Sequence, residues 1–360
     1  MKTIVQVVQH LRPGGLEVMA LEFMNFSRHR HNMKIVSLEG DLESAIKAWP
    51  RLDSYKDQLI FMNKPVGFSL SLIRDLKKTL KSLQADVVHT HHIGPYFYGG
   101  IASRLCGIPH MHTEHDAWHY NNRRHRQLHR LVSLVASPVK VADADIVADN
   151  MRNLPGNRDL RVIKNGVDVS RFVPGVKHHA RRAFGLPQNA KLLGASGRLE
   201  EVKGHGVLIA ALAALPQNFH LAIAGSGSLA EQLKNQARNL SVEKRVHFLG
   251  HVEDMPRFYQ ALDLFCLPSF NEGFPLAPLE AQACGIPAAV TDVGGATETL
   301  CPESGLVLRA GDPAEMAIRI CSYIAHPPAA CPREFVKSNA DVRGMARAYD
   351  SLAEGMCYGA

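Results

Sequence analysis

The sequence predicts an α/β protein made of two doubly wound parallel sheets. Short apolar runs alternate with longer amphipathic stretches along nearly the whole chain. Several of these runs are apolar throughout, as expected of strands in a parallel sheet that helices cover on both faces. The chain has 360 residues, 46% of them hydrophobic, which is enough for two cores rather than one.

The candidate strands form two sets. In the first half we expect strands at 3–8, 33–38, 86–90, 145–148 and 161–163. In the second half we expect them at 191–195, 219–224, 245–249, 262–267, 287–291 and 305–308. Between the sets, Asn165-Gly166-Val167-Asp168 and Phe172-Val173-Pro174 have the composition of turns and linkers. We therefore expect one domain at 1–168 and a second at 169–335.

The C-terminal segment 336–360 is predicted to contain one last helix. An apolar stripe at steps of three and four residues runs along it, formed by Val342, Met345, Tyr349, Leu352 and Met356. Such a stripe needs a partner surface. Pro332 and two prolines shortly before it would interrupt any helix continuous with the preceding domain.

Composition and charge narrow the class of protein. No apolar run approaches the ~20 residues that span a bilayer. The apolar run at the start of the sequence is too short and too interrupted by polar residues for a secretion signal. The seven cysteines are scattered without a C-x-x-C pair, which argues against a zinc ribbon or a disulfide framework and for the cytoplasm. The net charge of +7 favours anionic partners, although ordinary surface lysines would also account for it.

Ligands of open parallel sheets bind at the carboxyl ends of the strands, so the loops there are candidate sites. Gly14 and Gly15 follow the first strand and would let the backbone approach an anion at a helix start. A tight turn explains them equally well. The G-x-G-x-x-G fingerprint of dinucleotide-binding folds is absent at this loop, which makes a nicotinamide-dependent dehydrogenase a poor alternative.

Two loops in the second half could bind phosphate. Arg198 and Lys203 lie on one glycine-bounded loop and could reach the same diphosphate, the arginine through a forked contact and the lysine as a point charge. Gly225 and Gly227 follow the next strand, where their backbone N–H groups could face a phosphate. Solvated cations and a plain turn are the respective alternatives.

The segment 269–283 carries the densest signal. It follows the strand at 262–267 and then becomes helical, so backbone N–H groups from Gly273 to Leu276 would face a diphosphate or a sugar hydroxyl. Glu272 lies just before this turn and Glu280 two helical turns further on. The two carboxylates could serve different parts of one ligand, while a helix cap and a solvated helix face are the alternatives.

Taken in order, these motifs resemble glycosyltransferase family 4 over nearly the whole chain. The order is Gly14-Gly15, Asn165-Gly166-Val167-Asp168, Gly197-Arg198 with Lys203-Gly204, Gly225-Ser226-Gly227, Glu272 with Glu280, and Gly294-Gly295-Ala296-Thr297-Glu298. The two glutamates with seven residues between them are the most specific element. The resemblance implies the GT-B fold, two Rossmann-like doubly wound domains facing each other across a cleft, with the last helix crossing back to the N-terminal domain.

The resemblance also implies roles for individual residues. Arg198 and Lys203 would hold the donor diphosphate, Glu280 the ribose, and Glu272 the hydroxyls of the transferred sugar. The other implied donor-binding positions are Gly14, Gly15, Gly225, Gly227, Val252, Gly273, Phe274, Pro275 and Leu276. Family members are usually retaining and need no metal, which is physically reasonable because two fixed cations and a helix N-terminus can replace a divalent ion beside a diphosphate.

Histidines crowd two neighbouring strand ends between His89 and His119. In the family a histidine of this region contacts the donor sugar, and His115 is the best match, followed by His112. A zinc site on His115 and His119 lacks the His-Glu-x-x-His pattern and is the weaker alternative. Asp143-Ala144-Asp145 has the spelling of a metal-binding pair, but it is expected to begin a strand, so we discount it.

A basic stretch at 121–130 follows the histidines. If it is helical, its cations spread around most of the surface, and with Trp118 and Tyr120 it could contact a lipid-phosphate acceptor or an anionic membrane. Solvated surface charge explains the stretch equally well. Nucleic acid is a poorer partner because no recognised binding module accompanies the basic run.

The resemblance therefore implies a retaining glycosyltransferase that moves a sugar from a nucleotide diphosphate-sugar to a glycan or lipid-linked acceptor. A UDP-sugar is the first expectation for the donor, and a GDP-sugar is the alternative. Glu272 and His115 would be catalytic, with no metal or cofactor. We expect a cytoplasmic protein that can lie on the inner face of the plasma membrane and serves surface polysaccharide or lipopolysaccharide synthesis. A GT-B nucleotide-sugar epimerase and a non-catalytic nucleotide-sugar-binding protein are the alternatives.

Overall fold

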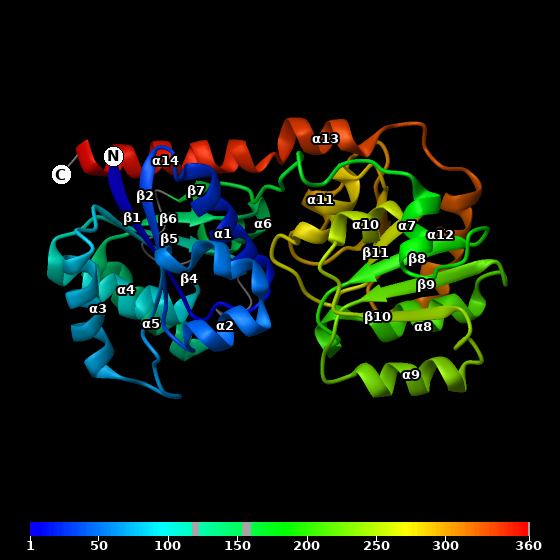
Figure 1. Cartoon of the computed structure of the whole chain (residues 1–360), viewed down its shortest axis with the longest axis horizontal. Helices are drawn as coiled ribbons and strands as arrows, with labels where there is room; N and C mark the ends of the chain where they lie inside the picture. Colours follow the sequence, from blue (N-terminus) through cyan, green and yellow to red (C-terminus); the bar gives the residue numbers. More distant parts are fainter. Residues whose placement is uncertain (117–121, 153–159, 359–360) are drawn as a thin grey trace. The chain divides into compact units, whose positions relative to one another are not determined.

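The computed structural model describes residues 1–116, 122–152 and 160–358 of the chain. The chain folds into two compact units, one formed by Met1–Gly166 together with Val342–Ala360 and the other by Val167–Asp341 (Figure 1). The chain therefore leaves the first unit, builds the whole second unit and then returns. Within the described residues, no helix combines the length and the apolar character needed to cross a bilayer.

The first unit contains a parallel sheet in the strand order β3-β2-β1-β4-β5-β6-β7. The strands are β1 (Lys2–Val8), β2 (His31–Ser37), β3 (Leu59–Phe61), β4 (Val87–His91), β5 (His110–Glu114), β6 (Val139–Ala142) and β7 (Arg161–Val162). The helices are α1 (Gly15–Ser27), α2 (Leu42–Ala48), α3 (Leu70–Ser82), α4 (Ile93–Cys106), α5 (Arg123–Ala136), α6 (Asp145–Arg152) and α14 (Val342–Tyr358), with the 3-10 helix η1 (Pro50–Gln58).

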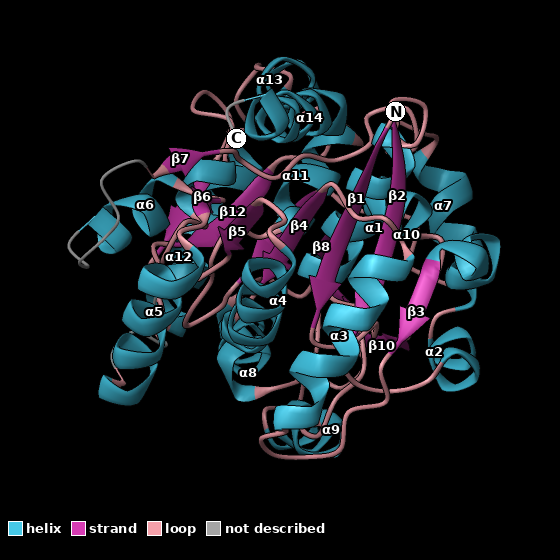
Figure 2. Ribbon diagram, turned by 90° about the vertical axis from the view of Figure 1, so that its left-hand side faces the viewer, coloured by secondary structure: helices cyan, strands magenta, loops and turns pink. Residues whose placement is uncertain are grey.

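Helices cover both faces of this sheet (Figure 2). Along β1, Ile4 and Val8 pack with α1 and α14, whereas Val5 and Val7 pack with α3 and α4. Both faces of the strand are therefore buried, which explains its continuous apolar sequence. The strand order reverses between β1 and β4, and this reversal marks the switch point at the carboxyl edge.

The second unit contains a parallel sheet in the order β10-β9-β8-β11-β12-β13. The strands are β8 (Lys191–Ser196), β9 (Phe219–Ala224), β10 (Val246–Gly250), β11 (Leu264–Leu267), β12 (Ala288–Thr291) and β13 (Leu306–Leu308). The helices are α7 (Lys177–Ala183), α8 (His205–Ala214), α9 (Ala230–Asn239), α10 (Met255–Gln260), α11 (Leu276–Ala283), α12 (Pro313–Ala325) and α13 (Pro332–Asn339), with the 3-10 helices η3 (Glu201–Lys203) and η4 (Thr297–Thr299). Its switch point lies between β8 and β11.

Helix α14 returns the chain to the first unit. Its apolar stripe packs into the core beside α1, where Val342, Met345 and Tyr349 are buried. The predicted helical segment began too early, at residue 336. Residues up to Asp341 belong to the second unit, because Pro332 starts the separate helix α13 and Asp341 forms an isolated β-bridge with Val167.

One predicted strand was wrong and three strands were missing from the prediction. Residues 145–148 lie in helix α6, and the strand of that region is β6, which precedes it. The buried residues Ala144, Val147, Ala148 and Met151 show the helical spacing that the Ile-Val pair concealed. The short strands β3 and β5 were also not among the predicted ranges. The other predicted strands coincide with observed ones to within two residues.

Candidate functional site

The loops at the carboxyl edge of the second sheet are braced against one another through their backbones. Gly197 N–H, just after β8, donates to Ala224 O at the end of β9 (3.0 Å). Phe270 N–H, on the loop after β11, donates to Val202 O (2.8 Å). These loops border the switch point between β8 and β11, where open α/β sheets bind their ligands.

Glycines permit this close bracing. A Cβ on Gly225 would lie 1.9 Å from Gly197 O, and one on Gly227 would lie 2.5 Å from Leu199 O. Gly225, at φ +152°, also has a backbone conformation that L side chains rarely adopt. The structure thus gives both glycines a role in packing one loop on the next, and phosphate binding by their N–H groups stays a prediction.

Lys203 and Glu272 meet at this edge. Lys203 Nζ donates to Glu272 Oε1 (2.6 Å), and Ser269 Oγ donates to the same oxygen (2.6 Å). The Glu272 side chain is 9% exposed and that of Lys203 22%. Gly294 admits this loop, since a Cβ there would lie 1.8 Å from Glu272 O. The structure therefore brings together the cation predicted for the leaving diphosphate and the carboxylate predicted for the sugar.

Helix α11 begins four residues after Glu272, and no side chain caps its N-terminus. Phe274 and Leu276 are buried, while Pro275 occupies the N-cap position in an extended conformation. Because proline lacks an N–H, Pro275 can shape the turn but cannot donate to a ligand. Donation to an anion at this helix start is left to its neighbours, including Gly273.

Glu280 of α11 has a partner that the sequence did not reveal. Tyr259 OH donates to Glu280 Oε2 (2.6 Å) and lies 3.4 Å from Ser196 Oγ. Burial, together with the charge of Glu280, raises the pKa of Tyr259 well above its ordinary value, so the phenol remains a donor. Nothing in the local pattern around Tyr259 distinguishes it from a core aromatic residue.

The remaining predicted donor contacts of this unit are Arg198, which is exposed on the loop after β8, and Val252, on the loop after β10. His205 was not predicted. It is the first residue of α8, and burial, followed by the charge of Lys203, lowers its pKa to about 4. His205 is therefore neutral at pH 7.

In the first unit, Gly14 and Gly15 differ in their surroundings. Gly14 is the N-cap of α1, and a Cβ on it would lie 2.3 Å from Glu17 Oε2. Glu17 is buried and its Oε1 lies 3.2 Å from His10 Nδ1. A Cβ on Gly15 would meet nothing within 4 Å. An internal carboxylate thus lies beside the glycine pair that was predicted to meet phosphates.

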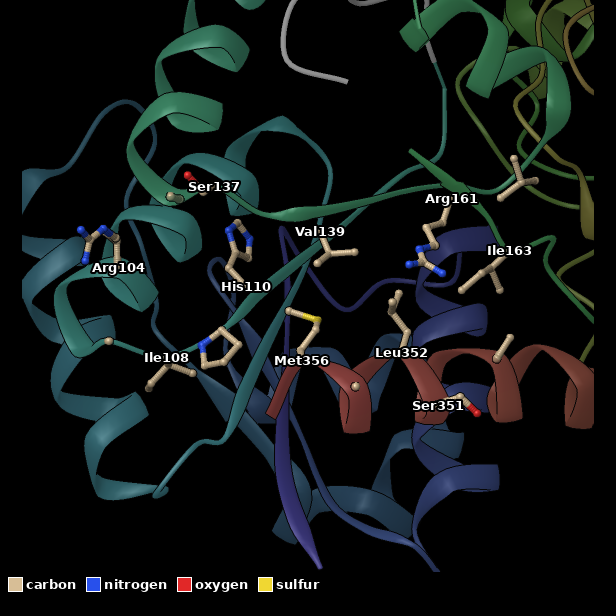
Figure 3. Close-up of a pocket in the computed structure, with 16 residues that line it drawn as sticks. Arg104, Ile108, His110, Ser137, Val139, Arg161, Ile163, Ser351, Leu352 and Met356 are labelled. Carbon is tan, nitrogen blue, oxygen red and sulfur yellow. The ribbon is translucent and has the colours of Figure 1, made fainter. Parts of the chain in front are cut away.

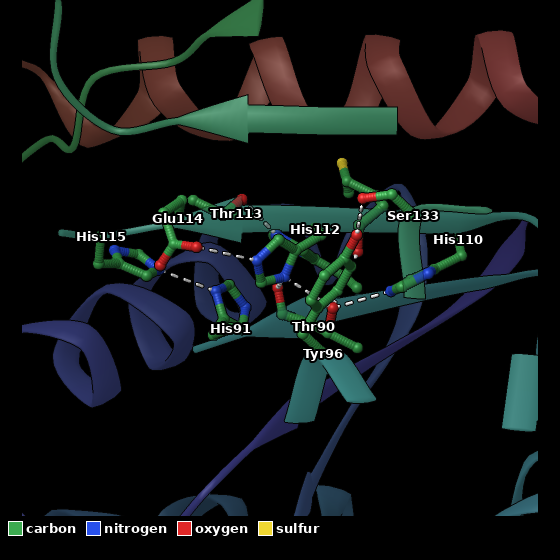
Figure 4. A network of polar contacts seen from close by, with 11 residues as sticks. Thr90, His91, Tyr96, His110, His112, Thr113, Glu114, His115 and Ser133 are labelled. Carbon is green, nitrogen blue, oxygen red and sulfur yellow. Dashed lines mark hydrogen bonds and ion pairs between the residues drawn. The ribbon is translucent and has the colours of Figure 1, made fainter. Parts of the chain in front are cut away.

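His115 directly follows β5 and belongs to a buried polar network (Figure 4). Its Nδ1 lies 3.0 Å from Asp143 Oδ2, and its Nε2 lies 3.1 Å from His91 Nδ1. Burial alone would lower the pKa of His115, but the hydrogen bond and the charge of Asp143 outweigh burial and raise it. Both ring nitrogens have partners, so a contact between His115 and a donor sugar, as predicted, would replace one of these two hydrogen bonds.

The reason for discounting Asp143 was wrong. Asp143 follows strand β6 and precedes α6, so it stands at the carboxyl end of a strand rather than at the start of one. Its Oδ2 also accepts from Asn165 Nδ2 (3.0 Å). The signal that could have identified this strand is the alternation of valines in Val139-Lys140-Val141, followed by an acidic residue at a helix start.

The second-choice histidine, His112, is fully buried. Its ring stacks on Tyr96 with 4.0 Å between ring centroids, and its Nε2 lies 3.4 Å from Glu114 Oε2 (Figure 4). Across residues 1–116, 122–152 and 160–358, no three or more His, Cys, Asp or Glu side chains are grouped so that they could hold a metal ion. His119 lies outside these residues.

A groove of about 990 Å³ lies at the opposite, amino edge of the first sheet (Figure 3). Its lining includes His110 and Val139, which begin β5 and β6, and Met356 of α14. None of the predicted site residues lines it. Its lining also includes Val162 and Ile163, at the carboxyl end of the edge strand β7.

Two family models match the chain. The model described as Glycosyltransferase Family 4 matches residues 13–171, and the model described as Glycosyl transferases group 1 matches residues 176–340. The two matches meet close to the boundary between the compact units.

Curated proteins are similar to the chain over part of its length. A UDP-Gal:alpha-D-GlcNAc-diphosphoundecaprenol alpha-1,3-galactosyltransferase of Escherichia coli is 31% identical over 256 residues, which are 63% of this chain and 64% of the relative. A D-inositol 3-phosphate glycosyltransferase of Stackebrandtia nassauensis is 31% identical over 279 residues, which are 68% of this chain and 61% of the relative. The chain thus spans less than two thirds of the length of these relatives.

Solved structures match the chain over its full length. HepE of Anabaena, in complex with UDP and glucose, has a TM-score of 0.87 at 22% identity, covering 99% of this chain and 100% of that one. The lipopolysaccharide outer core galactosyltransferase WaaB has a TM-score of 0.73 at 18% identity, covering 99% and 100%. With both halves matched by family models and both sheets by these neighbours, the chain belongs to the glycosyltransferases of group 1 and family 4 and has the GT-B fold.

Proposed function

We propose that this protein is a retaining glycosyltransferase that moves a sugar from a UDP-sugar to a glycan or lipid-linked acceptor. The observation that carries the proposal is the pairing of Lys203 with Glu272 on the loop that leads into α11, at the switch point of the second sheet. This arrangement offers a cation and backbone donors to a diphosphate and a carboxylate to sugar hydroxyls. The E. coli relative is named for UDP-Gal and the Anabaena structure holds UDP and glucose, which supports a UDP-linked donor.

In the proposed reaction, Lys203 exchanges Glu272 for the donor diphosphate, and Arg198 and the start of α11 complete its neutralisation. Glu272 then accepts from hydroxyls of the transferred sugar. Glu280, oriented by Tyr259, accepts from the ribose. The departing diphosphate takes the proton of the acceptor hydroxyl. The hydroxyl attacks on the same face that the diphosphate leaves, so the configuration of the sugar is retained. We propose no metal in this reaction, so activity should persist in excess chelator, and a loss that added Mg²⁺ restores would contradict this.

The acceptor side of the proposal includes a membrane surface. Helix α5 carries Arg123, Arg124 and Arg126 near its N-terminus, where cations oppose the helix dipole. The same helix exposes 52% of Leu131 and 73% of Leu134. Cations and exposed leucines on one helix suit a surface of anionic lipid. Trp118 and Tyr120, which were predicted to assist, lie outside the described residues.

Vesicle co-sedimentation tests this surface. We expect full-length protein to bind vesicles containing phosphatidylglycerol, and L134S with R123E to reduce the bound fraction several-fold. K78E, on the exposed side of α3, is the matched control for a lost surface cation. Equal loss with K78E would show that only the net charge matters, and no binding by the wild-type protein would remove the membrane from the proposal.

The first test of the function is a thermal-shift screen against UDP, GDP, ADP, their sugar conjugates and NAD. A ligand at about 100 times its Kd stabilises the folded protein by roughly 2.7 kcal/mol. We expect UDP and one UDP-sugar to raise the Tm, and Glu272→Gln to keep the UDP shift while sugar transfer is lost. Glu201→Gln, an exposed glutamate on the loop after β8, is the control. Stabilisation by NAD alone, or epimerisation of the donor without an acceptor, would overturn the proposal.

A further inference from the structure

A line of buried polar side chains crosses four strands of the first sheet. Gln6 comes from β1, His91 from the end of β4, His115 from the residue after β5, and Asp143 from the residue after β6; Asn165 lies at the end of the unit. None of these side chains is more than 8% exposed. Bulk solvent therefore does not reach them, and buried polar groups of this kind are generally hydrogen-bonded.

One end of the line is fixed by Gln6. Its Nε2 donates to Ala20 O (2.8 Å), so its Oε1 is the atom that faces His91 Nε2 at 3.3 Å. Because Oε1 can only accept, His91 Nε2 must carry a hydrogen. At the other end, Asp143 Oδ2 accepts from Asn165. Burial raises the pKa of Asp143, while His115 and Asn165 favour its ionised form. In that form the carboxylate can only accept from His115 Nδ1, at 3.0 Å.

The outer nitrogens of the two rings, His91 Nε2 and His115 Nδ1, are therefore both hydrogen-bond donors. The inner nitrogens, His91 Nδ1 and His115 Nε2, face each other at 3.1 Å (Figure 4). Two lone pairs would repel at this distance, so one inner nitrogen carries a hydrogen as well. The two rings then share three N–H hydrogens, one more than two neutral imidazoles hold. The pair is a cation, and the carboxylate of Asp143 balances its charge.

We propose that Asp143, Asn165 and His91 are positioning residues that hold His115 as an imidazolium, whose Nε2–H is donated to His91 at rest and to an oxygen of the donor during the reaction. The last part rests on the proposed function. When the Nε2–H of His115 is donated to a substrate oxygen instead, the proton stays on His115. His91 is neutral, and its Nε2–H still donates to Gln6. No proton has to enter or leave the buried line.

The neighbouring groups place the charge on His115 rather than on His91. Burial and the nearby rings of His89, His112 and His92 lower the pKa of His91. The carboxylates of Asp143, Glu114 and Asp116 favour the charged form of His115. On α14, the hydroxyl of Tyr349 bonds to Thr113 rather than to either ring.

The backbone beside His91 supports a functional reading of the line. His92 has φ +65° and ψ 163°, a region that is almost confined to glycine. A histidine held there is strained, and a purely structural turn could avoid this strain with a glycine.

The experiment is ¹⁵N NMR of the imidazole nitrogens in the full-length protein between about pH 5.5 and 9, a range that includes the ordinary histidine pKa. We expect His115 to stay doubly protonated above that pKa, because its own pKa is raised. Asp143→Asn should lower the measured pKa of His115 by about one unit or more. Asp145→Asn, which removes an exposed carboxylate two residues away, should leave that pKa unchanged. Two singly protonated rings in the wild type near pH 7 would overturn the proposal without any variant having to fold.

Kinetics extend the test to the reaction. If the imidazolium acts on the donor, kcat/KM falls at high pH as His115 loses its proton, and Asp143→Asn moves this decline to lower pH by the same amount that NMR measures. An unmoved pH profile would overturn the positioning role. An extra proton seen by NMR in a protein without sugar transfer would instead overturn the proposed function and leave the protonation of the pair standing.

Discussion

Lys203 and Glu272 neutralise each other through a contact of 2.6 Å on side chains that are mostly buried. UDP without its sugar would take Lys203 and leave Glu272 with fewer donors. We therefore expect Glu272→Gln to bind UDP at least as tightly as the wild type, while transfer falls by about 100-fold or more. Lys203→Met should weaken UDP binding by about tenfold or more, since it removes a charged hydrogen bond. Calorimetry measures both affinities, and weaker UDP binding by Glu272→Gln would contradict the exchange of partners.

Glycine positions provide a matched pair of substitutions. Gly294 has φ +50°, and a Cβ there would strike Glu272 O, whereas a Cβ on Gly15 would meet nothing within 4 Å. Gly294→Ala should therefore destabilise the protein by about 1 kcal/mol or more and weaken donor binding. Gly15→Ala should leave stability unchanged or raise it, because alanine favours the helix that begins there. Urea unfolding distinguishes the two, and equal effects would contradict the packing at Gly294.

At this scale the sequence predicted the positions of residues that lie on loops at strand ends, while their roles toward a donor stay predictions. Lys203 and Glu272 each lie at a strand end with suitable chemistry, and the structure brings them together. Tyr259 and Asp143 could not be assigned in the same way, because their partners Glu280 and His115 come from elements distant in the sequence.

At the scale of elements, the pattern predicted strands with a continuous apolar sequence such as β1, but it missed β5, whose five residues are all buried although only Met111 is apolar. It failed at 145–148, where two β-branched residues inside a short helix imitate a strand. The short edge-side strand β3 has only three residues, too few for any period to show. Tertiary pairing with β2 defines it, and a local pattern cannot carry that information.

Helix α14 should be essential to the first unit. Tyr349 is fully buried, packs on Phe23 with 5.1 Å between ring centroids, and bonds to Thr113. We expect Tyr349→Ala to destabilise the unit by about 3–5 kcal/mol. Gly344→Ala in the same helix, where a Cβ meets nothing within 4 Å, should not destabilise it.

Tryptophan fluorescence measures the stability of this unit selectively. The chain has two tryptophans, Trp49 and Trp118, and both belong by position to the first unit. The urea midpoint of the fluorescence transition should fall for Tyr349→Ala and hold for Gly344→Ala. A midpoint unchanged by Tyr349→Ala would show that α14 is not part of the folded core.

For the whole molecule, we expect one histidine of each unit, His115 in the first and His205 in the second, to contribute to stability in opposite pH ranges. The pKa of His115 is raised above its ordinary value of 6.5, so its contribution to stability is present below about pH 6.5 and is lost as pH rises through the folded-state pKa. The pKa of His205 is lowered from 6.5 to about 4, so its contribution is present above pH 6.5 and is lost as pH falls toward 4.

Hydrogen exchange followed by peptide can resolve the two units in the intact chain. His205→Gln should reduce the loss of protection in the second unit between pH 6.5 and 4 while leaving the first unit unchanged, since these are the two pKa values of His205. The same loss of protection in His205→Gln and in the wild type would assign the acid sensitivity to other groups.

The return of the chain through α14 also bears on how the protein is made. Met19 and Phe23 of α1 form their core with Val342 and Met345, which are synthesised only after the whole second unit. The second unit contains no residue beyond Asp341, so its core can be complete while that of the first still lacks a wall. The first unit thus begins to be synthesised before the second but completes its core after it, and until α14 has left the ribosome it presents an apolar surface for a chaperone to cover.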